Sequence, residues 1–394
     1  MKKLKTIADL GMKIRVPYNH DLTLIDQVIE YKDYIDSIYL APSSSALLTS
    51  GAGTLLPTVP DYDEIVRDII RRLKRHNIDV YMLLNAYYIT QDILMDFKGS
   101  TLYTYLRKMD RYGLQHVTVA DILLAQRIRT YFPDWKIEAS VNAKIDSVTK
   151  ARYWKECVGV DSITVLLDIN KKPLLIKAIK EAVRVPITMI AHEICVPDCP
   201  YEIQHCLSPL FYKGGSEPIF FDCGMMMRNK PWLAYQGPII VPYNLRYYKG
   251  IVEIVKLAGR RYTTEHIVNT IRHYALNINS LAYFYNHGIP ARKGEALHPY
   301  LQQFIFNDIK HPYLYEEPKS VFKKTAFCNR DCAKCDWCYK TWKKFCKNIR
   351  PPSEFKELKP FFIGKKPKGT GDKLHSFRLR LEKRQIEQEL QVIP

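Results

Sequence analysis

The sequence predicts an α/β fold, a TIM-type (β/α)8 barrel with a cysteine-rich insertion after its seventh strand and a basic C-terminal appendage. Between residues 12 and 258, short β-branched runs alternate with longer segments of helical periodicity, which is the pattern of repeated βα units. Eight such units suit a TIM barrel, whereas an open doubly wound sheet usually has fewer strands. Neither a GxGxxG turn nor a P-loop occurs in the 394 residues, which also disfavours the open sheet.

The elements follow one another in order. The expected strands are Lys13–Val16, Ser37–Leu40, Asp79–Leu84, His116–Val119, Ile137–Val141, Ser162–Leu167, Pro186–Ile190 and Val252–Leu257. Helical periodicity predicts helices over residues 21–33, 62–76, 101–112, 122–132, 146–155, 172–182 and 264–275.

Two segments depart from the barrel pattern. Residues 195–250 form an irregular insertion rich in Cys, Pro and Gly, far longer than the usual βα loop of about 2–6 residues. Loops of that length are usually functional, and bound metal could order this one. Beyond about residue 290 a basic, aromatic segment leads to an exposed charged helix near 376–390. We therefore expect a barrel with its insertion over residues 1–290 and a C-terminal extension with a four-cysteine site over residues 291–394.

Composition and charge narrow the class of protein. With 47% hydrophobic and 25% charged residues, wholesale disorder and collagen-like architectures are excluded. No apolar run approaches the roughly 18–20 residues that span a bilayer, and the first residues lack a signal-peptide core, so we expect a cytoplasmic protein with no membrane partner. The formal net charge is +18, and residues 290–394 hold 23 Lys and Arg against 12 Asp and Glu. Such a basic segment favours phosphate backbones, although many basic proteins bind no nucleic acid.

Polar side chains recur just after the predicted strands. In a barrel these positions form the catalytic rim, and here they include Asn19, Asn85, Asn142 and Asp168. Taken one at a time, each fits an ordinary capping or turn residue. Taken together, they could line a pocket for a small polar substrate.

The first cysteine group lies in the insertion and reads Cys195-x3-Cys199-x6-Cys206-x16-Cys223. Without a secretory signal, this grouping favours metal or cluster ligation over disulfides. Four thiolates at the catalytic end suit a [4Fe–4S] cluster, although a tetrahedral zinc site takes the same ligands, and the alternative is ordinary buried cysteines. The neighbouring His192, Glu193 and His205 are candidates for proton transfer or substrate contact.

The second cysteine group is denser: Cys328-x3-Cys332-x2-Cys335-x2-Cys338. Its compact spacing favours iron–sulfur over zinc as the bound group. Its first three cysteines also match the CxxxCxxC spacing of radical S-adenosylmethionine enzymes, but the motif follows the barrel and has Lys334 where an aromatic residue is usual. The flanking Lys340, Lys343 and Lys344 are candidate contacts for nucleic acid. The aromatic residues among them either stack on unpaired bases or cover the cluster.

The cysteine region and the segment "VKLAGRRYTTEHIVNTIRHY" resemble the collagenase-like peptidase family of unknown catalytic type. The resemblance rests on Lys256, Gly259, Arg260 and Tyr274, while Ala258 replaces the usual Glu. The family includes iron–sulfur proteins of anaerobic ubiquinone hydroxylation and proteins needed to hydroxylate tRNA and rRNA bases. The resemblance implies cluster ligands at Cys199, Cys206 and Cys223, with Cys195 in place of a ligand that lies further downstream in the family. It also implies substrate contacts at Lys256 and Arg260.

Three functions remain open at this point. The first is a redox enzyme, or a component of one, with two [4Fe–4S] clusters and an electron donor, which modifies RNA or a small aromatic compound without oxygen. The second is a protein that binds tRNA, rRNA or a protein partner and whose iron–sulfur or zinc sites are structural. The third is a peptidase, although HEICV has Val196 where a zinc peptidase needs its second His.

Overall fold

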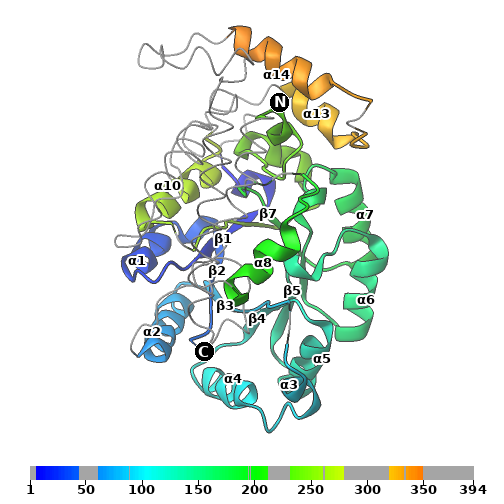
Figure 1. Cartoon of the computed structure of the whole chain (residues 1–394). Coiled ribbons are helices and arrows are strands. Elements are labelled where there is room, and N and C mark those ends of the chain that lie inside the picture. The colour runs from blue at the N-terminus through cyan, green and yellow to red at the C-terminus, as the bar shows by residue number, and fades with distance from the viewer. Residues whose placement is uncertain are drawn as a thin grey trace, which may run out of the picture. The chain divides into compact units, whose positions relative to one another are not determined.

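Eight parallel strands close into a barrel, pairing in chain order until β8 returns to β1 (Figure 1). The computed structural model describes residues 6–43, 61–87, 89–193, 195, 197–211, 231–260, 262–278, 319–331 and 334–348. The strands are β1 (Lys13–Pro17), β2 (Ile35–Leu40), β3 (Asp79–Leu84), β4 (His116–Val119), β5 (Lys136–Ala139), β6 (Ser162–Thr164), β7 (Ile187–Ile190) and β8 (Ile254–Lys256). The predicted TIM-type (β/α)8 barrel is therefore confirmed.

Two strands end earlier than the sequence predicts. β5 was expected to reach Val141 and β6 to reach Leu167, but both stop about two or three residues sooner. The chain turns there in short 3-10 helices, η4 (Val141–Ala143) and η5 (Leu167–Ile169). These turns form part of the rim at the carboxyl ends of the strands.

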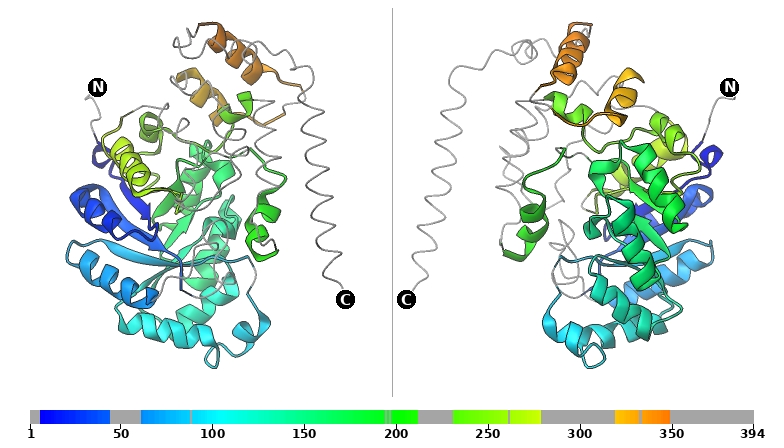
Figure 2. Two further views of the ribbon diagram at one scale, coloured as in Figure 1. Left: turned by 60° about the vertical axis from the view of Figure 1, so that its left-hand side comes forward. Right: turned by 90° about the vertical axis from the view of Figure 1, so that its right-hand side faces the viewer.

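Seven helices occupy predicted positions around the barrel (Figures 1 and 2). They are α1 (Thr23–Glu30), α2 (Tyr62–Lys74), α4 (Thr101–Arg111), α5 (Ile122–Tyr131), α6 (Val148–Val158), α7 (Pro173–Val183) and α10 (Thr264–Ala275). In α2 the apolar residues Val66, Ile69 and Leu73 are buried, while the basic residues of its last turn point outward or lie partly exposed. Four helices begin at a side-chain oxygen that accepts a backbone N–H, supplied by Ser100, Asp121, Ser147 and Thr263.

Four helices were not predicted: α3 (Gln91–Met95), α8 (Glu202–Phe211), α13 (Lys319–Ala326) and α14 (Trp337–Asn348). Helix α8 corrects the expectation that the insertion is irregular, because its apolar residues recur at helical spacing. The expected helix at 376–390 and the expected boundary at residue 290 lie outside the described residues. The chain groups into two compact units, residues 1–338 and residues 339–394. Among the helices that the structure describes, none has the length and apolar character to cross a bilayer.

The barrel interior contains a buried charge network centred on Glu138 of β5. The Arg15 guanidinium of β1 forms an ion pair with Glu138, donates to the Ser37 hydroxyl at 2.7 Å and lies 3.8 Å from the ring centroid of Tyr81. Lys256 Nζ of β8 lies 3.7 Å from the Glu138 carboxylate. Hydroxyls from three more strands surround the carboxylate, at 3.1, 3.5 and 2.8 Å, and belong to Thr118, Ser162 and Thr188.

This network sets the charge state of Glu138. Burial by itself would raise the pKa of the carboxyl, but the charges of Arg15 and Lys256 and the Thr188 hydrogen bond outweigh burial and lower the pKa to about 2. Because the pKa in the folded state lies below its ordinary value of 4.5, the carboxylate stabilises the fold at neutral pH. This contribution is lost as the pH falls from about 4.5 through about 2.

Replacing Glu138 with Gln keeps the size of the side chain and leaves the Arg15 guanidinium without its buried counter-ion. Removing one partner of a buried pair costs about 3–5 kcal/mol, so we expect the free energy of unfolding to fall by about that amount in urea denaturation at pH 7. The control is Glu181→Gln, which breaks an exposed pair with Lys177 on α7 and should change stability by less than about 0.5 kcal/mol. Equal effects of the two substitutions would contradict a central role for Glu138.

Candidate functional site at the mouth of the barrel

Five side chains meet at the carboxyl end of the barrel. They come from β2, from the end of β8 and from the segments that follow β7 and β8, and they interact electrostatically with one another. We call this set the mouth cluster: Tyr39, Glu193, Lys256, Arg260 and Tyr262. The Tyr39 hydroxyl donates to the Leu257 carbonyl at 2.7 Å, and Lys256 Nζ lies 4.5 Å from the Tyr39 ring centroid.

Lys256 connects the mouth cluster to the charge network below it. Its side chain is buried, and burial lowers the pKa of the ammonium group to about 8, with Arg15 and Arg260 acting in the same direction and Glu138 opposing them. The Lys256 side chain therefore carries its charge at neutral pH but releases a proton more readily than an ordinary lysine.

Arg260 holds an unsatisfied guanidinium nitrogen. Its Nη1 atom is buried and has no hydrogen-bond partner among the described residues. Burial lowers the pKa of Arg260, while the neighbouring phenols of Tyr39 and Tyr62 oppose that shift. A buried N–H of a cation without a partner is costly, so this nitrogen is suited to an anionic group that arrives with a ligand.

The glycine before Arg260 is required by the local backbone. Gly259 has φ of +101°, and a Cβ placed there would lie 2.1 Å from the Tyr262 ring. Any other residue would therefore be strained and would displace Tyr262 from the mouth cluster. This requirement gives a physical reason for the glycine in the Lys-x-x-Gly-Arg segment.

The predicted proton-transfer residues occupy different surroundings. His192 is buried, its Nδ1 accepts the Ala258 N–H at 3.2 Å, and burial together with His266 lowers its pKa to about 3. Burial raises the pKa of Glu193 to about 7, and Glu193 belongs to the mouth cluster. His205 lies on α8, where burial lowers its pKa. Glu193 interacts electrostatically with Tyr39 and Tyr262, and the His192 ring lies edge-on to the Tyr262 ring at 6.3 Å between centroids.

The predicted asparagines lie on the rim. Asn19 Nδ2 donates to the Tyr262 carbonyl and to the Thr264 hydroxyl, both at 3.1 Å, and so joins the loop after β1 to the start of α10. Asn142 Nδ2 donates to the Asn85 carbonyl at 2.8 Å, whereas the buried Asn85 Oδ1 atom has no hydrogen-bond partner among the described residues. Asn19 therefore supports the mouth cluster, and Asn85 retains an acceptor for a ligand.

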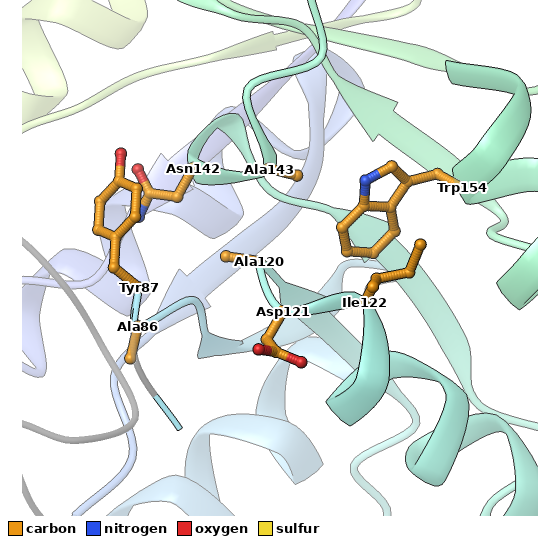
Figure 3. A pocket seen from close by; sticks show the side chains of 8 residues that line it. All are labelled: Ala86, Tyr87, Ala120, Asp121, Ile122, Asn142, Ala143 and Trp154. Atoms are coloured by element: carbon orange, nitrogen blue, oxygen red, sulfur yellow. The ribbon is translucent and has the colours of Figure 1, made fainter. Parts of the chain in front are cut away.

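A cavity of about 300 Å³ opens at the ends of β3, β4 and β5 (Figure 3). Tyr87 and Trp154 stand on opposite sides of it. The other lining residues are Ala86, Ala120, Asp121, Ile122, Asn142 and Ala143. The volume of the cavity is large enough for a small ligand. Because three of its lining residues are alanines, a planar ligand could lie close to the backbone.

Three cysteines of the first group, Cys195, Cys199 and Cys206, interact with one another in the structure. Cys195 hydrogen-bonds to Cys199 and lowers the pKa of the Cys199 thiol to about 7. Cys206, on α8, interacts electrostatically with Cys199 and lies beside Tyr87 and Lys144. Cys223 lies outside the described residues, and among those described no three His, Cys, Asp or Glu side chains are arranged to hold a metal ion.

The second cysteine group packs within the same compact unit as the barrel up to Cys338. The thiol of Cys338 is buried and accepts a hydrogen bond from Gln236 Nε2 at 3.4 Å, and Cys328 Sγ accepts the Arg330 N–H at 3.3 Å. Cys335 is exposed, and Cys332 lies outside the described residues. The predicted ligands thus lie on one segment. Among the described residues, no three of them come close enough together to hold a metal ion.

Asp168 lies between the two cysteine segments. Its carboxylate accepts the Asp198 N–H at 3.0 Å, and its carbonyl accepts Arg330 Nη2 at 2.6 Å. Burial raises its pKa. These contacts give Asp168 a supporting role that its position after a strand did not reveal.

Several of these residues were not predicted from the sequence. Arg15, Tyr39, Glu138 and Arg330 were not selected, although Arg15 and Glu138 leave a signal: each is a charged residue inside a short, otherwise buried strand. A buried charge in a strand indicates an interior partner, but the sequence does not say which strand supplies it.

Together these observations define a (β/α)8-barrel protein with a cationic, tyrosine-lined mouth beside a thiol-bearing loop. Residues 61–196 match the family model described as peptidase family U32. The curated "Uncharacterized protease MJ1657" of Methanocaldococcus jannaschii is 24% identical over 297 residues, which cover 73% of this chain and 83% of that protein. These matches support the resemblance of the chain to the collagenase-like peptidase family, with the family model matching over residues 61–196.

Two solved structures are also similar to this chain. The U32 peptidase Mk0906 is 21% identical, with a TM-score of 0.43 over 66% of this chain and 95% of that one. The YdjI aldolase from Escherichia coli K12 is 10% identical, with a TM-score of 0.36 over 81% and 93% of the two chains.

Arg260→Met should raise the free energy of unfolding of the ligand-free protein by about 1–3 kcal/mol, because it removes a buried donor that has no partner. Arg15→Met should have the opposite effect, since Arg15 is paired with Glu138. Urea denaturation of the three proteins measures both changes. A clear loss of stability in Arg260→Met would show that an internal partner holds Arg260.

Proposed function

We propose that this protein is an iron–sulfur enzyme, or the iron–sulfur component of one, for oxygen-independent hydroxylation or a related modification of RNA or a small ring compound. The observation that carries the proposal is the position of Cys195, Cys199 and Cys206 on the segment that leaves β7 at the mouth of the barrel. Catalytic groups of TIM barrels lie at this end.

The residue types on this loop support a cluster, although the described side chains are not arranged around a metal ion. Cys195 and Cys199 are in hydrogen-bond contact, Cys206 interacts with Cys199, and thiolates are the ligands that iron–sulfur clusters and zinc prefer. Cys223 is the fourth predicted ligand. A cluster bound here would supply one-electron transfer next to the substrate site.

The chain's own residues would bind and orient the substrate. Arg260 and Lys256 present positive charge at the bottom of the mouth, where an anionic group of the substrate would satisfy the open Arg260 nitrogen. The phenols of Tyr39 and Tyr62, which lie close to Arg260, provide a surface for a ring. The mouth therefore suits an anionic ring compound or a nucleotide.

Metal analysis tests this function. We expect anaerobically purified protein to contain about eight irons and eight acid-labile sulfides per chain, and Cys199→Ser and Cys335→Ser each to remove about half. The control is Cys157→Ser, an exposed cysteine on α6, which should leave both contents unchanged. Zinc at both sites without sulfide would refute the proposed redox function.

A second candidate function is nucleic-acid binding by the C-terminal segment. Helix α14 exposes Lys340, Lys343 and Lys344, and Lys343 Nζ lies 5.8 Å from the ring centroid of Tyr339. Lysines interleaved with aromatic rings are suited to phosphates and unpaired bases. Peptide hydrolysis is the third candidate, and assays on the same preparations would detect it.

Changing Lys340, Lys343 and Lys344 to Glu should weaken binding of a labelled single-stranded RNA and reduce the slope of log K against log salt by about 2, the loss expected for three phosphate contacts. Fluorescence anisotropy between 50 and 200 mM salt is the measurement, in the range where such contacts are sensitive. The matched control changes the exposed Lys32, Lys74 and Lys98 of the barrel to Glu, which alters net charge equally. If both triple variants lose affinity alike, the effect is general charge and α14 is not the binding site.

A further inference from the structure

The proposed function makes no use of the cavity at the ends of β3, β4 and β5. Three successive connections supply its walls: Tyr87 follows β3, Asp121 follows β4, and Ala143 lies on η4 after β5. Helix α6 adds Trp154, whose side chain is only 6% exposed. None of the described lining residues belongs to a cysteine-bearing segment, so the shape of the cavity does not depend on bound metal.

Two aromatic side chains suit the cavity to a planar or cationic group. Tyr87 and Trp154 stand on opposite sides of it, with the small side chains of Ala120 and Ala143 between them (Figure 3). Its volume of about 300 Å³ lies at the lower end of the range for ligand pockets. The face of an aromatic ring stacks on planar groups and attracts cations, so a ligand that is both planar and positive gains from both walls.

The lining of the cavity also favours positive charge. Asp121 is its one residue with a formal charge among those described, and no described Lys, Arg or His lines it. One Asp121 oxygen accepts the Leu124 N–H at 2.9 Å and so caps α5, which leaves further lone pairs of the carboxylate for a ligand. The cavity therefore disfavours anions, in contrast to the mouth cluster with its Lys256 and Arg260.

Lys144 restrains the Tyr87 wall from outside the cavity. Its Nζ atom lies 5.4 Å from the ring centroid of Tyr87, and its charge is balanced by an ion pair with Glu202 of α8. Lys144 is not a lining residue and forms no ion pair with Asp121. The contact thus shows that the Tyr87 ring attracts a cation, while Asp121 keeps its negative charge for a ligand.

We propose that this cavity is a second ligand site, which binds a guanidinium group between Tyr87 and Trp154 and pairs it with Asp121. A guanidinium is planar, stacks on aromatic rings and presents paired N–H donors to a carboxylate, so it satisfies the walls and the charge of the cavity together. The site goes beyond the proposed function, because this binding requires neither a metal nor the mouth cluster. The group has two possible sources, a small guanidino compound or an arginine side chain of a peptide.

Isothermal titration calorimetry of the full chain with three matched probes tests this specificity. Butylguanidine is a planar cation, butylurea is planar and neutral, and butylammonium is a cation without a planar group. We expect butylguanidine to bind at least about tenfold more tightly than the other two, because it alone combines stacking with charge. Equal affinity for butylurea or butylammonium, or no binding of butylguanidine, overturns the proposal.

Substitution of the carboxylate locates the bound probe. Asp121→Asn keeps a residue that caps α5 but removes the charge, so the affinity for butylguanidine should fall by about tenfold or more. The matched control is Asp134→Asn, which removes an equal charge from an exposed residue outside the lining. Equal losses in the two variants would show a general charge effect and would overturn the site.

Two further variants test the walls and the space between them. Trp154→Leu should weaken binding of butylguanidine by several-fold, whereas Tyr153→Leu, at an exposed position of the same helix, should leave it unchanged. Ala143→Leu fills the cavity from a partly exposed position and should abolish binding, which keeps the test decisive if Trp154→Leu does not fold. Binding that survives Ala143→Leu overturns the proposal.

Competition identifies the source of the group. L-arginine represents a small guanidino compound, and the peptide Gly-Arg-Gly represents an arginine side chain within a chain. The stronger competitor against butylguanidine names the source, and either result supports the site. Failure of both to displace butylguanidine would overturn it.

Discussion

The carboxylate of Glu138 is the interaction on which the barrel and its mouth depend. It lies on β5 and contacts groups from β1, β4, β6, β7 and β8. An unpaired charge in the interior of a protein is costly, and the Arg15 guanidinium is offset by this buried carboxylate and by the partly exposed Asp36 carboxylate at 3.1 Å. The hydroxyls of neighbouring strands satisfy the remaining carboxylate lone pairs, which fixes the relative positions of the strands that carry them.

The mouth of the barrel is positively charged because the carboxylate of this network does not offset all of the nearby cations. Glu138 is shared between Arg15 and Lys256, and no further described carboxylate is paired with Arg260. The result is a positive, partly unsatisfied surface lined by tyrosines at the end of the barrel where TIM-barrel sites are found. Functional sites often retain polar groups that the fold leaves unpaired, because the ligand completes them.

The cysteine groups are arranged around the same rim. Cys195 and Cys199 lie on the loop after β7, and Arg330, two residues after Cys328, contacts Asp198 on that loop and Asp168. Asp168, a predicted substrate contact, also accepts hydrogen bonds from Asp198 and Arg330 and so joins the two thiol-bearing segments. The mouth cluster, the small-ligand cavity, and Cys195 and Cys199 therefore follow the carboxyl ends of the strands.

The sequence by itself determined the barrel, its eight strands and seven of its helices, because hydrophobic periodicity and local turn chemistry are properties of neighbouring residues. It also identified both cysteine groups and, through the resemblance, Lys256 and Arg260. Tertiary structure alone decided which charges meet: that Arg15 pairs with Glu138, 123 residues away, and that Arg330 reaches Asp198, 132 residues away. Such pairings depend on barrel closure and on the path of long connections, and no local pattern encodes them.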